Sequence, residues 1–447
     1  MGKNQFLNNF KLNFTYPSQY QGSRVTTMLH KKPLFTRKVK TVVAMALAMV
    51  LCGSFVFVLL QSWSSVNWFG SEKSTLLSSS PVVDSSVWRS VAANAWAYFQ
   101  PGIGVDSNTG LPYAGGSDFK GFTDWDLGVY IQAVIDAQKI GLIHTDGVWG
   151  SNERLEKVMT FLETRPLNES TNFPFWFYDA TNGQNYHQLS DKATTPVDGA
   201  DTGRLLLALN NLKNCQPNLT SRINYIVYNR TDYTPLLSGI SSSDGSNSIY
   251  AYYIYSGYAS FWPIQVGSVP SELLSNIASR PTVTTYGVSL PNISLTCEPL
   301  LCSIFELNKT DSRIVNLMRQ VYLAHEAYYN NTDQFVAFSE GNSRTNQFIY
   351  EWIVAPDGST WKITNDAKTR YYDINPIIYD KVALSFLALY NTTYAYNLSV
   401  YLEKNMPKPI DGYLAGIDTL GKVVPGVGSN TNGLILDAAL YAMQKPR

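Results

Sequence analysis

The sequence predicts a mainly α-helical protein: a barrel of paired helices with a small β-hairpin insertion, preceded by one transmembrane helix. Three observations carry this prediction. An uncharged apolar run lies near the N-terminus, about eleven segments with helical periodicity follow it, and one short stretch alternates like a hairpin. Apolar residues make up 45% of the chain and charged residues only 15%, so 447 residues can build a large core.

The transmembrane segment is predicted at residues 41–62. Thr41–Leu60 carries no charge and is long enough to cross a hydrocarbon core. Residues 1–40 contain eight Lys or Arg and no Asp or Glu, so the positive-inside rule places them in the cytoplasm. The alternative is a cleaved signal peptide, which the length of the run and the lack of a small-x-small site disfavour.

These features divide the chain into four parts. We expect a cytoplasmic basic tail (1–40), the membrane anchor (41–62), a Ser-rich stalk (63–85) and an extracellular domain (86–447) of a single-pass cell-membrane protein. Eight N-x-Ser/Thr sequons are compatible with a glycosylated outer part: Asn168, Asn218, Asn229, Asn292, Asn308, Asn330, Asn391 and Asn397. Cys297 and Cys302 either close a small disulfide loop or remain two free thiols.

The outer domain is predicted to consist of amphipathic helices joined by loops rich in Gly, Pro, Asn and aromatic residues. The longer helices are expected at residues 86–99, 124–141, 152–164, 201–213, 311–329, 377–390, 393–404 and 431–444. Shorter ones are expected near residues 221–229, 248–261 and 270–279. The hairpin is expected at 346–355 and 359–363, around a Pro-Asp-Gly turn.

Charge and motifs exclude several classes of function. Outside the first 40 residues the chain is mildly acidic, with 34 acidic and 26 basic residues, which argues against nucleic acid as a partner. The sequence contains no HExxH motif, no Walker A loop, no Gly-x-Ser-x-Gly elbow and no dense His/Cys cluster. We therefore expect no metal and no other cofactor.

Two acidic motifs open predicted helices. One contains Asp124 and Asp126 after Thr123, and the other contains Asp198 and Asp201. The structural interpretation is helix capping, because Thr123 and Asp198 are good N-caps and an acid follows each of them three residues later. The alternative is a functional role for these carboxylates.

The surrounding aromatic residues favour the functional alternative. Trp125 lies inside the first motif and Trp176 precedes the second, and aromatic rings stack well on the apolar faces of sugars, whose hydroxyl rims need carboxylates and amides. A third acid, Glu340, lies before Gly341 in a loop that leads into the hairpin and has no evident capping role. Carboxylates with aromatics are thus the best constellation that the sequence offers.

The order of these motifs resembles an uncharacterised family related to glucoamylase-like barrels and to the glucan-processing domain of cyclic β-1,2-glucan synthases. The resemblance spans residues 86–444 and is weak at 215–310. The segments that carry it are Thr109-Gly-Leu111, Thr123-Asp-Trp-Asp-Leu-Gly128, Ala137–Ile143, Asp201-Thr-Gly-Arg204-Leu-Leu206, Ser339-Glu340, Gln347-Phe-Ile-Tyr350, Asp357–Trp361, Asp380–Leu384, Gly412–Gly416 and Asn430-Thr-Asn432.

The resemblance implies an (α/α)6 toroid with a carbohydrate-directed cleft at one end. We expect Glu340 to be the general acid and Asp124 the base of an inverting glycoside hydrolase, with Asp201 and Arg204 orienting the site. The remaining candidate substrate-binding residues are Asp126, Trp125, Asp198, Trp176, Tyr350 and Asp418, the last of which stands where the family tends to have Glu.

Two other functions remain open. The first is a non-catalytic protein that binds polysaccharide or glycoprotein, and the second is a structural surface protein in which the barrel is a spacer. The expected partner is a polysaccharide or other glycan, and the oligomeric state is left open.

Overall fold

The computed structural model describes residues 83–116, 119–169, 171–186, 196–345, 347–365 and 368–445. The predicted tail, membrane segment and most of the predicted stalk fall outside these ranges. Within the described ranges, no helix combines the length and the apolar character that a membrane crossing requires.

A ring of inner helices forms the centre of the described part. The inner helices are α4 (Asp124–Ile140), α6 (Gly199–Cys215), α10 (Tyr250–Phe261), α13 (Glu298–Glu306), α15 (Asp380–Tyr390) and α17 (Ser429–Gln444). From α4 to α13 each inner helix packs on the next, α15 packs on α17, and α17 packs on both α13 and α4, so that the C-terminal helix closes the ring.

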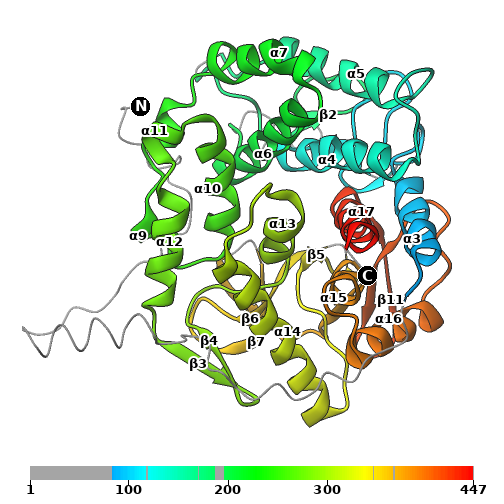
Figure 1. Cartoon of the computed structure of the whole chain (residues 1–447), viewed down its shortest axis with the longest axis vertical. Coiled ribbons are helices and arrows are strands. Elements are labelled where there is room, and N and C mark those ends of the chain that lie inside the picture. The colour runs from blue at the N-terminus through cyan, green and yellow to red at the C-terminus, as the bar shows by residue number, and fades with distance from the viewer. Residues whose placement is uncertain are drawn as a thin grey trace, which may run out of the picture. The chain divides into compact units, whose positions relative to one another are not determined.

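Outer helices cover this ring and alternate with the inner ones along the chain. They are α3 (Ser85–Tyr98), α5 (Ser151–Thr164), α7 (Thr220–Tyr225), α12 (Val269–Ala278), α14 (Ser312–Thr332) and α16 (Thr393–Asn405). Figure 1 shows α3, α5, α7 and α12 at the periphery. The prediction of a mainly helical barrel is therefore confirmed.

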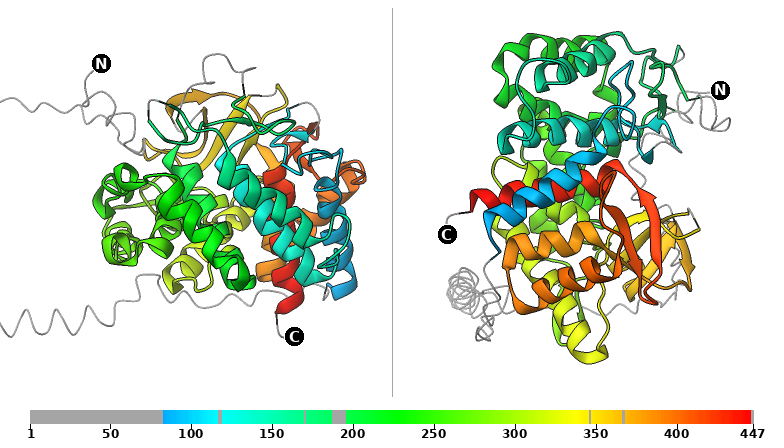
Figure 2. Two further views of the ribbon diagram at one scale, coloured as in Figure 1. Left: turned by 90° about the horizontal axis from the view of Figure 1, so that it is seen from above. Right: turned by 90° about the vertical axis from the view of Figure 1, so that its right-hand side faces the viewer.

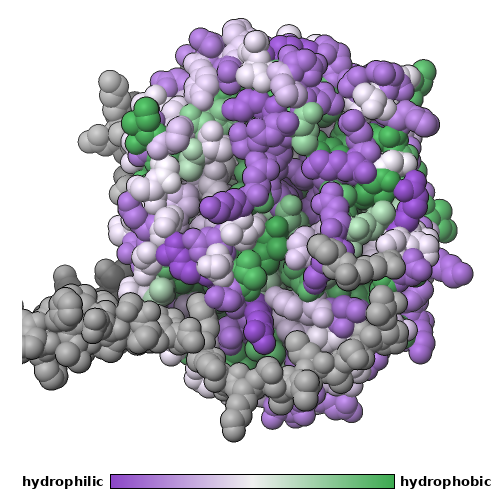
Figure 3. Space-filling view, in the orientation of Figure 1, coloured by the Kyte–Doolittle hydropathy of each residue, from purple (hydrophilic) through white to green (hydrophobic). Residues whose placement is uncertain are grey.

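Figure 3 presents the barrel face that is turned to the viewer in Figure 1. Polar residues cover most of this face and small apolar groups are scattered among them. This agrees with outer helices that bury only one side: α5, for example, buries Leu155, Val158 and Leu162 and leaves Glu156 exposed.

The local sequence explains where the helices begin and end. In α4, Thr123 and Asp126 form a reciprocal capping box, and Gly141 ends the helix with φ 77°. The helix predicted at 377–390 begins late, however. Residues Ile377–Tyr379 form a short strand, β9, because Ile377 and Ile378 pair with the hairpin strand β10 (Leu414–Asp418), whose partner is β11 (Val423–Val427).

The predicted hairpin is confirmed and belongs to a larger antiparallel sheet. The four strands run in the order β5 (Glu340–Asn342), β6 (Phe348–Val354), β7 (Thr360–Asn365) and β8 (Lys368–Tyr372). Smaller pairs are β1 (Gly121–Phe122) with β2 (Tyr178–Asp179), and β3 (Thr282–Thr285) with β4 (Val288–Pro291). In both views of Figure 2 the four-stranded sheet lies at the end of the barrel opposite the C-terminus of α17.

Helix α13 was not predicted, and it overturns the disulfide alternative. Cys297 caps this helix and Cys302 lies five residues further along it, so their side chains leave the helix in different directions. Cys297 Sγ lies 3.9 Å from His325 Nε2, whereas Cys302 Sγ accepts a hydrogen bond from Arg204 at 3.4 Å. Both are buried free thiols.

The interior of the ring contains polar groups between helices that are distant in sequence. Arg204 of α6 pairs with Glu306 of α13 at 2.7 Å, and both side chains are 1% exposed. Asp136 of α4 and Asp437 of α17 share a hydrogen bond. Burial raises the pKa of both carboxyls, and the neighbouring Asp136 raises that of Asp437 further. The pair therefore holds a proton where α17 closes the ring on α4.

Helices α6 and α10 meet through glycines. A Cβ on Gly257 would lie 1.9 Å from the carbonyl oxygen of Gly203. We predict that Gly257→Ala lowers the free energy of unfolding by about 1–3 kcal/mol or more, because the backbones of α6 and α10 must move apart to admit the methyl group. The control is Gly426→Ala, where no atom lies within 4 Å of the added methyl group. Urea unfolding of both variants measures the difference, and equal effects would contradict this account of the crossing.

The acid pair between α4 and α17 predicts a pH dependence of stability. Since the folded-state pKa of Asp437 is raised, the folded chain keeps a proton that the unfolded chain releases above about pH 4. The free energy of unfolding should therefore fall as pH rises from about 4 toward the folded pKa. Asp437→Asn retains hydrogen-bonding capacity without this ionisation, so its unfolding curves should show a smaller slope. If the free energy of unfolding of Asp437→Asn depended on pH as steeply as that of the wild type, the Asp136–Asp437 pair would not be its cause.

Candidate active site

The inner helices begin at the end of the barrel where the sheets lie, and side chains from their first turns meet there. Trp125 of α4 donates a hydrogen bond from its indole to Asn430 of α17 at 3.5 Å. Asn430 donates to Glu298 at the start of α13, and Lys381 at the start of α15 donates to the other oxygen of Glu298. Helix N-termini favour negative charge, so this end of the barrel suits carboxylates.

Glu298 is the centre of this contact network. Its side chain is fully buried and also accepts a hydrogen bond from Ser339 at 2.9 Å. Burial alone would raise the pKa of Glu298, but the Lys381 ammonium and the hydrogen bonds from Lys381 and Asn430 outweigh burial and lower this pKa. Glu298 is therefore a buried ionised carboxylate with its charge partner in contact.

Glu340 lies directly beside Glu298 and is in the opposite protonation state. It is 6% exposed, forms a hydrogen bond with Glu298, and accepts one from the Tyr250 hydroxyl at 2.5 Å. Burial and then the negative charge of Glu298 raise the pKa of Glu340 to about 8, against the smaller opposing effect of Lys381. Glu340 thus carries a proton at neutral pH, as a general acid must.

The two carboxylates of the first acidic motif, Asp124 and Asp126, make contacts within the fold. Asp124 forms an ion pair with Arg165 at 2.5 Å, in which both side chains are 1% exposed. Asp126 accepts hydrogen bonds from the Thr123 amide at 3.0 Å and from the Ser429 hydroxyl at 2.8 Å. The capping interpretation holds for Asp126, and burial of Asp124 removes it from contact with solvent water.

The second acidic motif remains accessible. Asp198 is exposed and caps α6 by accepting from the Ala200 amide at 2.8 Å. Asp201 is half-buried and accepts from the Trp176 indole at 3.1 Å. Burial, followed by the charges of Asp198, Asp126 and Asp124, raises the pKa of Asp201 well above its usual value. Burial also raises the pKa of Asp198, against the opposing hydrogen bond from the Ala200 amide, so both acids of this pair bind a proton more readily than a free aspartate.

The other predicted site residues take different positions. Arg204 is buried in its ion pair with Glu306. Its guanidinium carbon lies 4.6 Å from the centroid of the Trp125 ring, so the cation packs against the face of that ring. Tyr350 lies directly opposite Glu340 across β5 and β6. Asp418 fixes the turn between β10 and β11 by accepting from the amides of Leu420 and Lys422 at 3.0 and 2.9 Å.

The structure thus brings the predicted residues together in two groups. Tyr350 lies beside Glu340, while Trp176, Asp198 and Asp201 lie at the start of α6 with the charges of Asp124 and Asp126 near them. Trp125, Asn430 and Glu298 form the hydrogen-bonded link toward Glu340.

The prediction missed Glu298, Lys381 and Asn430 as members of the site. The signal for Glu298 was available, since Pro299 precedes a short apolar run and thereby marks a helix start. Lys381 and Asn430 lie within predicted helices, and nothing in their sequence neighbourhood indicates that they meet Glu298.

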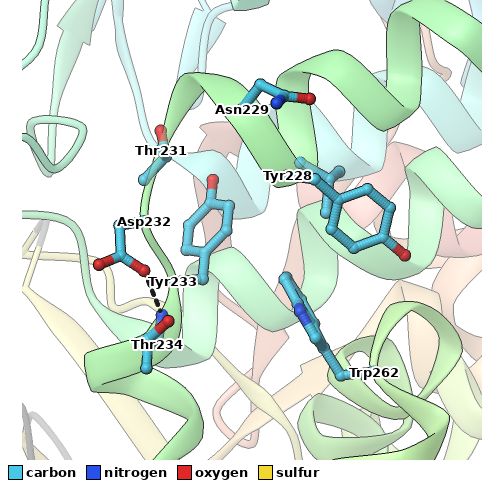
Figure 4. Close-up of a pocket in the computed structure, with 8 residues that line it drawn as sticks. Tyr228, Asn229, Thr231, Asp232, Tyr233, Thr234 and Trp262 are labelled. Atoms are coloured by element: carbon cyan, nitrogen blue, oxygen red, sulfur yellow. Dashed lines mark hydrogen bonds between the residues drawn. The ribbon is translucent and has the colours of Figure 1, made fainter.

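A separate surface pocket of about 230 Å³ lies between α10 and the segment after α7. Its aromatic lining is formed by Tyr228, Tyr233 and Trp262, as Figure 4 shows. The Asp232 carboxylate accepts from the backbone amide of Thr234 at 3.0 Å, within its own loop. None of the acids discussed above lines this pocket, so it is distinct from the carboxylate site.

Solved structures similar to this chain include endo-β-1,2-glucanases and candidate glucoamylases. The endo-β-1,2-glucanase from Chitinophaga pinensis, in complex with sophorotriose and glucose, is 14% identical, with a TM-score of 0.56 over 81% of this chain and 94% of that chain. A candidate glucoamylase from Bacteroides caccae gives the same identity, coverage and TM-score. The endo-β-1,2-glucanase from Talaromyces funiculosus, in complex with sophorose, is 10% identical over 80% and 84% of the two chains, with a TM-score of 0.53.

These similarities establish a glucoamylase-like helical barrel fold. No curated protein matches the sequence. The family model described as "Protein of unknown function (DUF3131)" matches residues 90–445, which is most of the chain and all of its inner helices. This chain therefore belongs to the DUF3131 family, as the order of its motifs predicts.

Proposed function

We propose that this protein is a glycan-processing enzyme of the glycoside hydrolase type, held at the outer face of the cell membrane by residues 41–62. The observation that carries the proposal is the pair of touching carboxyls with opposite protonation states, Glu340 and Glu298. Two carboxyls whose environments drive their pKa values apart are typical of acid–base catalysis. The fold supports the same conclusion, since proteins of this fold include β-1,2-glucanases.

In this proposal Glu340 is the general acid. Its proton passes to the glycosidic oxygen as the bond from that oxygen to the anomeric carbon breaks. The glycosidic electron pair stays with the leaving sugar, which departs as a neutral alcohol. Glu298 and Tyr250 hold the Glu340 carboxyl in place and act through it rather than on the substrate.

The accessible acids of α6 supply the base in the inverting reaction. A carboxylate of the Asp198–Asp201 pair takes a proton from water, and the water oxygen forms the new bond to the anomeric carbon on the opposite face of the sugar. Asp124 was the predicted base, but it pairs with Arg165 and both side chains are 1% exposed, which shields it from the solvent water that this role requires. Asp198 and Asp201 are open to solvent, and the proposal therefore transfers the role to them.

The neighbouring structures give the first substrate to test. The two glucanases named above are complexes with sophorotriose and sophorose, and we propose a neutral linear glucan of the β-1,2 type as the substrate class. Aromatic rings beside the acids, such as Tyr350 and Trp125, suit the apolar faces of uncharged sugar rings.

We predict that Glu340→Gln lowers kcat on β-1,2-glucan by about 10²–10⁴-fold, because the amide cannot donate the required proton. Binding measured by calorimetry should be retained. The control is Glu156→Gln in an exposed ion pair on α5, which should leave turnover unchanged. Wild-type protein that binds glucan without releasing sugars would instead establish a non-catalytic glycan-binding protein.

The pH profile tests the role of Glu298. Activity of the wild type should fall above about pH 8 as Glu340 loses its proton. Glu298→Gln combined with Lys381→Met removes both charges without leaving either one unpaired. Because the effect of Glu298 on the pKa of Glu340 exceeds that of Lys381, the alkaline limb of kcat/KM should move to lower pH. A limb that stays in place would exclude Glu298 as the group that sets this pKa.

A further inference from the structure

Strand β6 carries an aromatic ring at every second position. Phe348, Tyr350 and Trp352 share one face of the strand because side chains alternate along it. The rings of Phe348 and Tyr350 lie 5.4 Å apart at 73°, and those of Tyr350 and Trp352 lie 5.4 Å apart and almost parallel, at 7°. The three rings form a continuous row, which we call the β6 ladder.

The ladder runs from the surface into the protein. Phe348 is 41% exposed, Tyr350 is half-buried, and Trp352 is 2% exposed with its indole donating to Thr364 at 2.7 Å. The inner ring is thus fixed by packing and a hydrogen bond. The outer ring leaves much of its apolar surface in water, which packing of the fold does not require.

The inner part of the ladder reaches the candidate acid. The antiparallel register sets Glu340 directly opposite Tyr350 and Asn342 directly opposite Phe348, and directly opposed residues lie on the same face of a sheet. Tyr250 lies edge-on to both Tyr350 and Trp352 at 6.2 and 6.3 Å and donates its hydroxyl to Glu340. Glu340 and the ladder therefore share one face of the sheet, which is buried at Glu340 and Trp352 and exposed at Phe348.

The chemistry of this surface fits a chain of neutral sugars. Flat rings offer contact to the C–H faces of pyranose units, and the exposed Asn342 amide offers a donor and an acceptor to hydroxyl groups beside the outermost ring. Phe348 has no hydrogen-bonding group, so it can contribute only through its ring. A row of rings, unlike a single ring, suits successive units of a polymer.

We propose that Phe348 and Tyr350, with Asn342 at their edge, form a substrate subsite for the sugar units of a glycan chain that extends from Glu340 to the protein surface. This inference rests on the proposed function of Glu340. It implies that oligosaccharides long enough to reach Phe348 bind more tightly than short ones that occupy only the position beside Glu340.

The test measures binding and turnover against chain length. Linear β-1,2-glucooligosaccharides of increasing length are titrated into the full-length Glu340→Gln protein by calorimetry, and kcat/KM is measured with the otherwise wild-type protein. Phe348→Ala in either background should weaken binding of long chains, and lower kcat/KM for them, by about three- to tenfold. The shortest bound oligosaccharide should be unaffected.

Two further variants separate stacking from folding. Phe348→Leu keeps apolar bulk at the strand but removes the flat ring, so it should behave like Phe348→Ala toward long chains. Tyr225→Ala removes a ring of similar exposure (49%) on α7, away from the sheet, and should change nothing. Full activity of Phe348→Leu on long chains, or an equal loss at every length, would overturn the subsite.

The outcomes distinguish this inference from the proposed function. Length-dependent binding through Phe348 without any sugar release would support the subsite and overturn the hydrolase. Sugar release that Phe348→Ala leaves unchanged at every length would support the hydrolase and overturn the subsite. Failure of the wild type to bind any length would overturn both.

Discussion

The buried ion pair between Glu298 and Lys381 is the interaction on which the candidate site depends. It joins the first turns of two inner helices, and Asn430 adds a third. A charge in a protein interior is tolerated only when a partner and hydrogen bonds replace its hydration, and Glu298 has both. The ion pair in turn fixes a negative charge beside Glu340, which keeps the Glu340 proton in place.

The barrel topology makes this arrangement possible. Because inner and outer helices alternate along the chain, every inner helix begins at the same end, and that end gathers the positive poles of several helix dipoles. The loops and the four-stranded sheet that lie there supply Ser339 and Glu340. Acids from α4 and α6 form one group at this end of the barrel, and acids from α13 and β5 form another.

The aromatic residues have two different roles. Many of those in the described part of the chain are buried in the core or pack against it, and some of these support the site from within. Trp125, for example, rests over the Arg204 guanidinium while its indole holds Asn430. The β6 ladder is different, because it begins with an exposed ring and ends with a buried one. This gradient separates rings that build the barrel from the outer rings that we propose as a sugar-binding subsite.

By itself, the sequence determined the helical class, most helix positions, the hairpin and the family. The class, the helix positions and the hairpin follow from local periodicity, capping residues such as Thr123 and Gly141, and the Pro-Asp-Gly turn, all of which act within a few residues. The family follows from the order of short motifs along the chain. The sequence also singled out Glu340 and the acids of α6 as candidate site residues. The tertiary structure alone decided which acids are accessible, which are neutral and which are paired. Asp124 meets Arg165, and Glu298 meets Lys381, across 41 and 83 residues of chain. A pKa depends on burial and on charges brought close by folding, so no local pattern around these acids could reveal it.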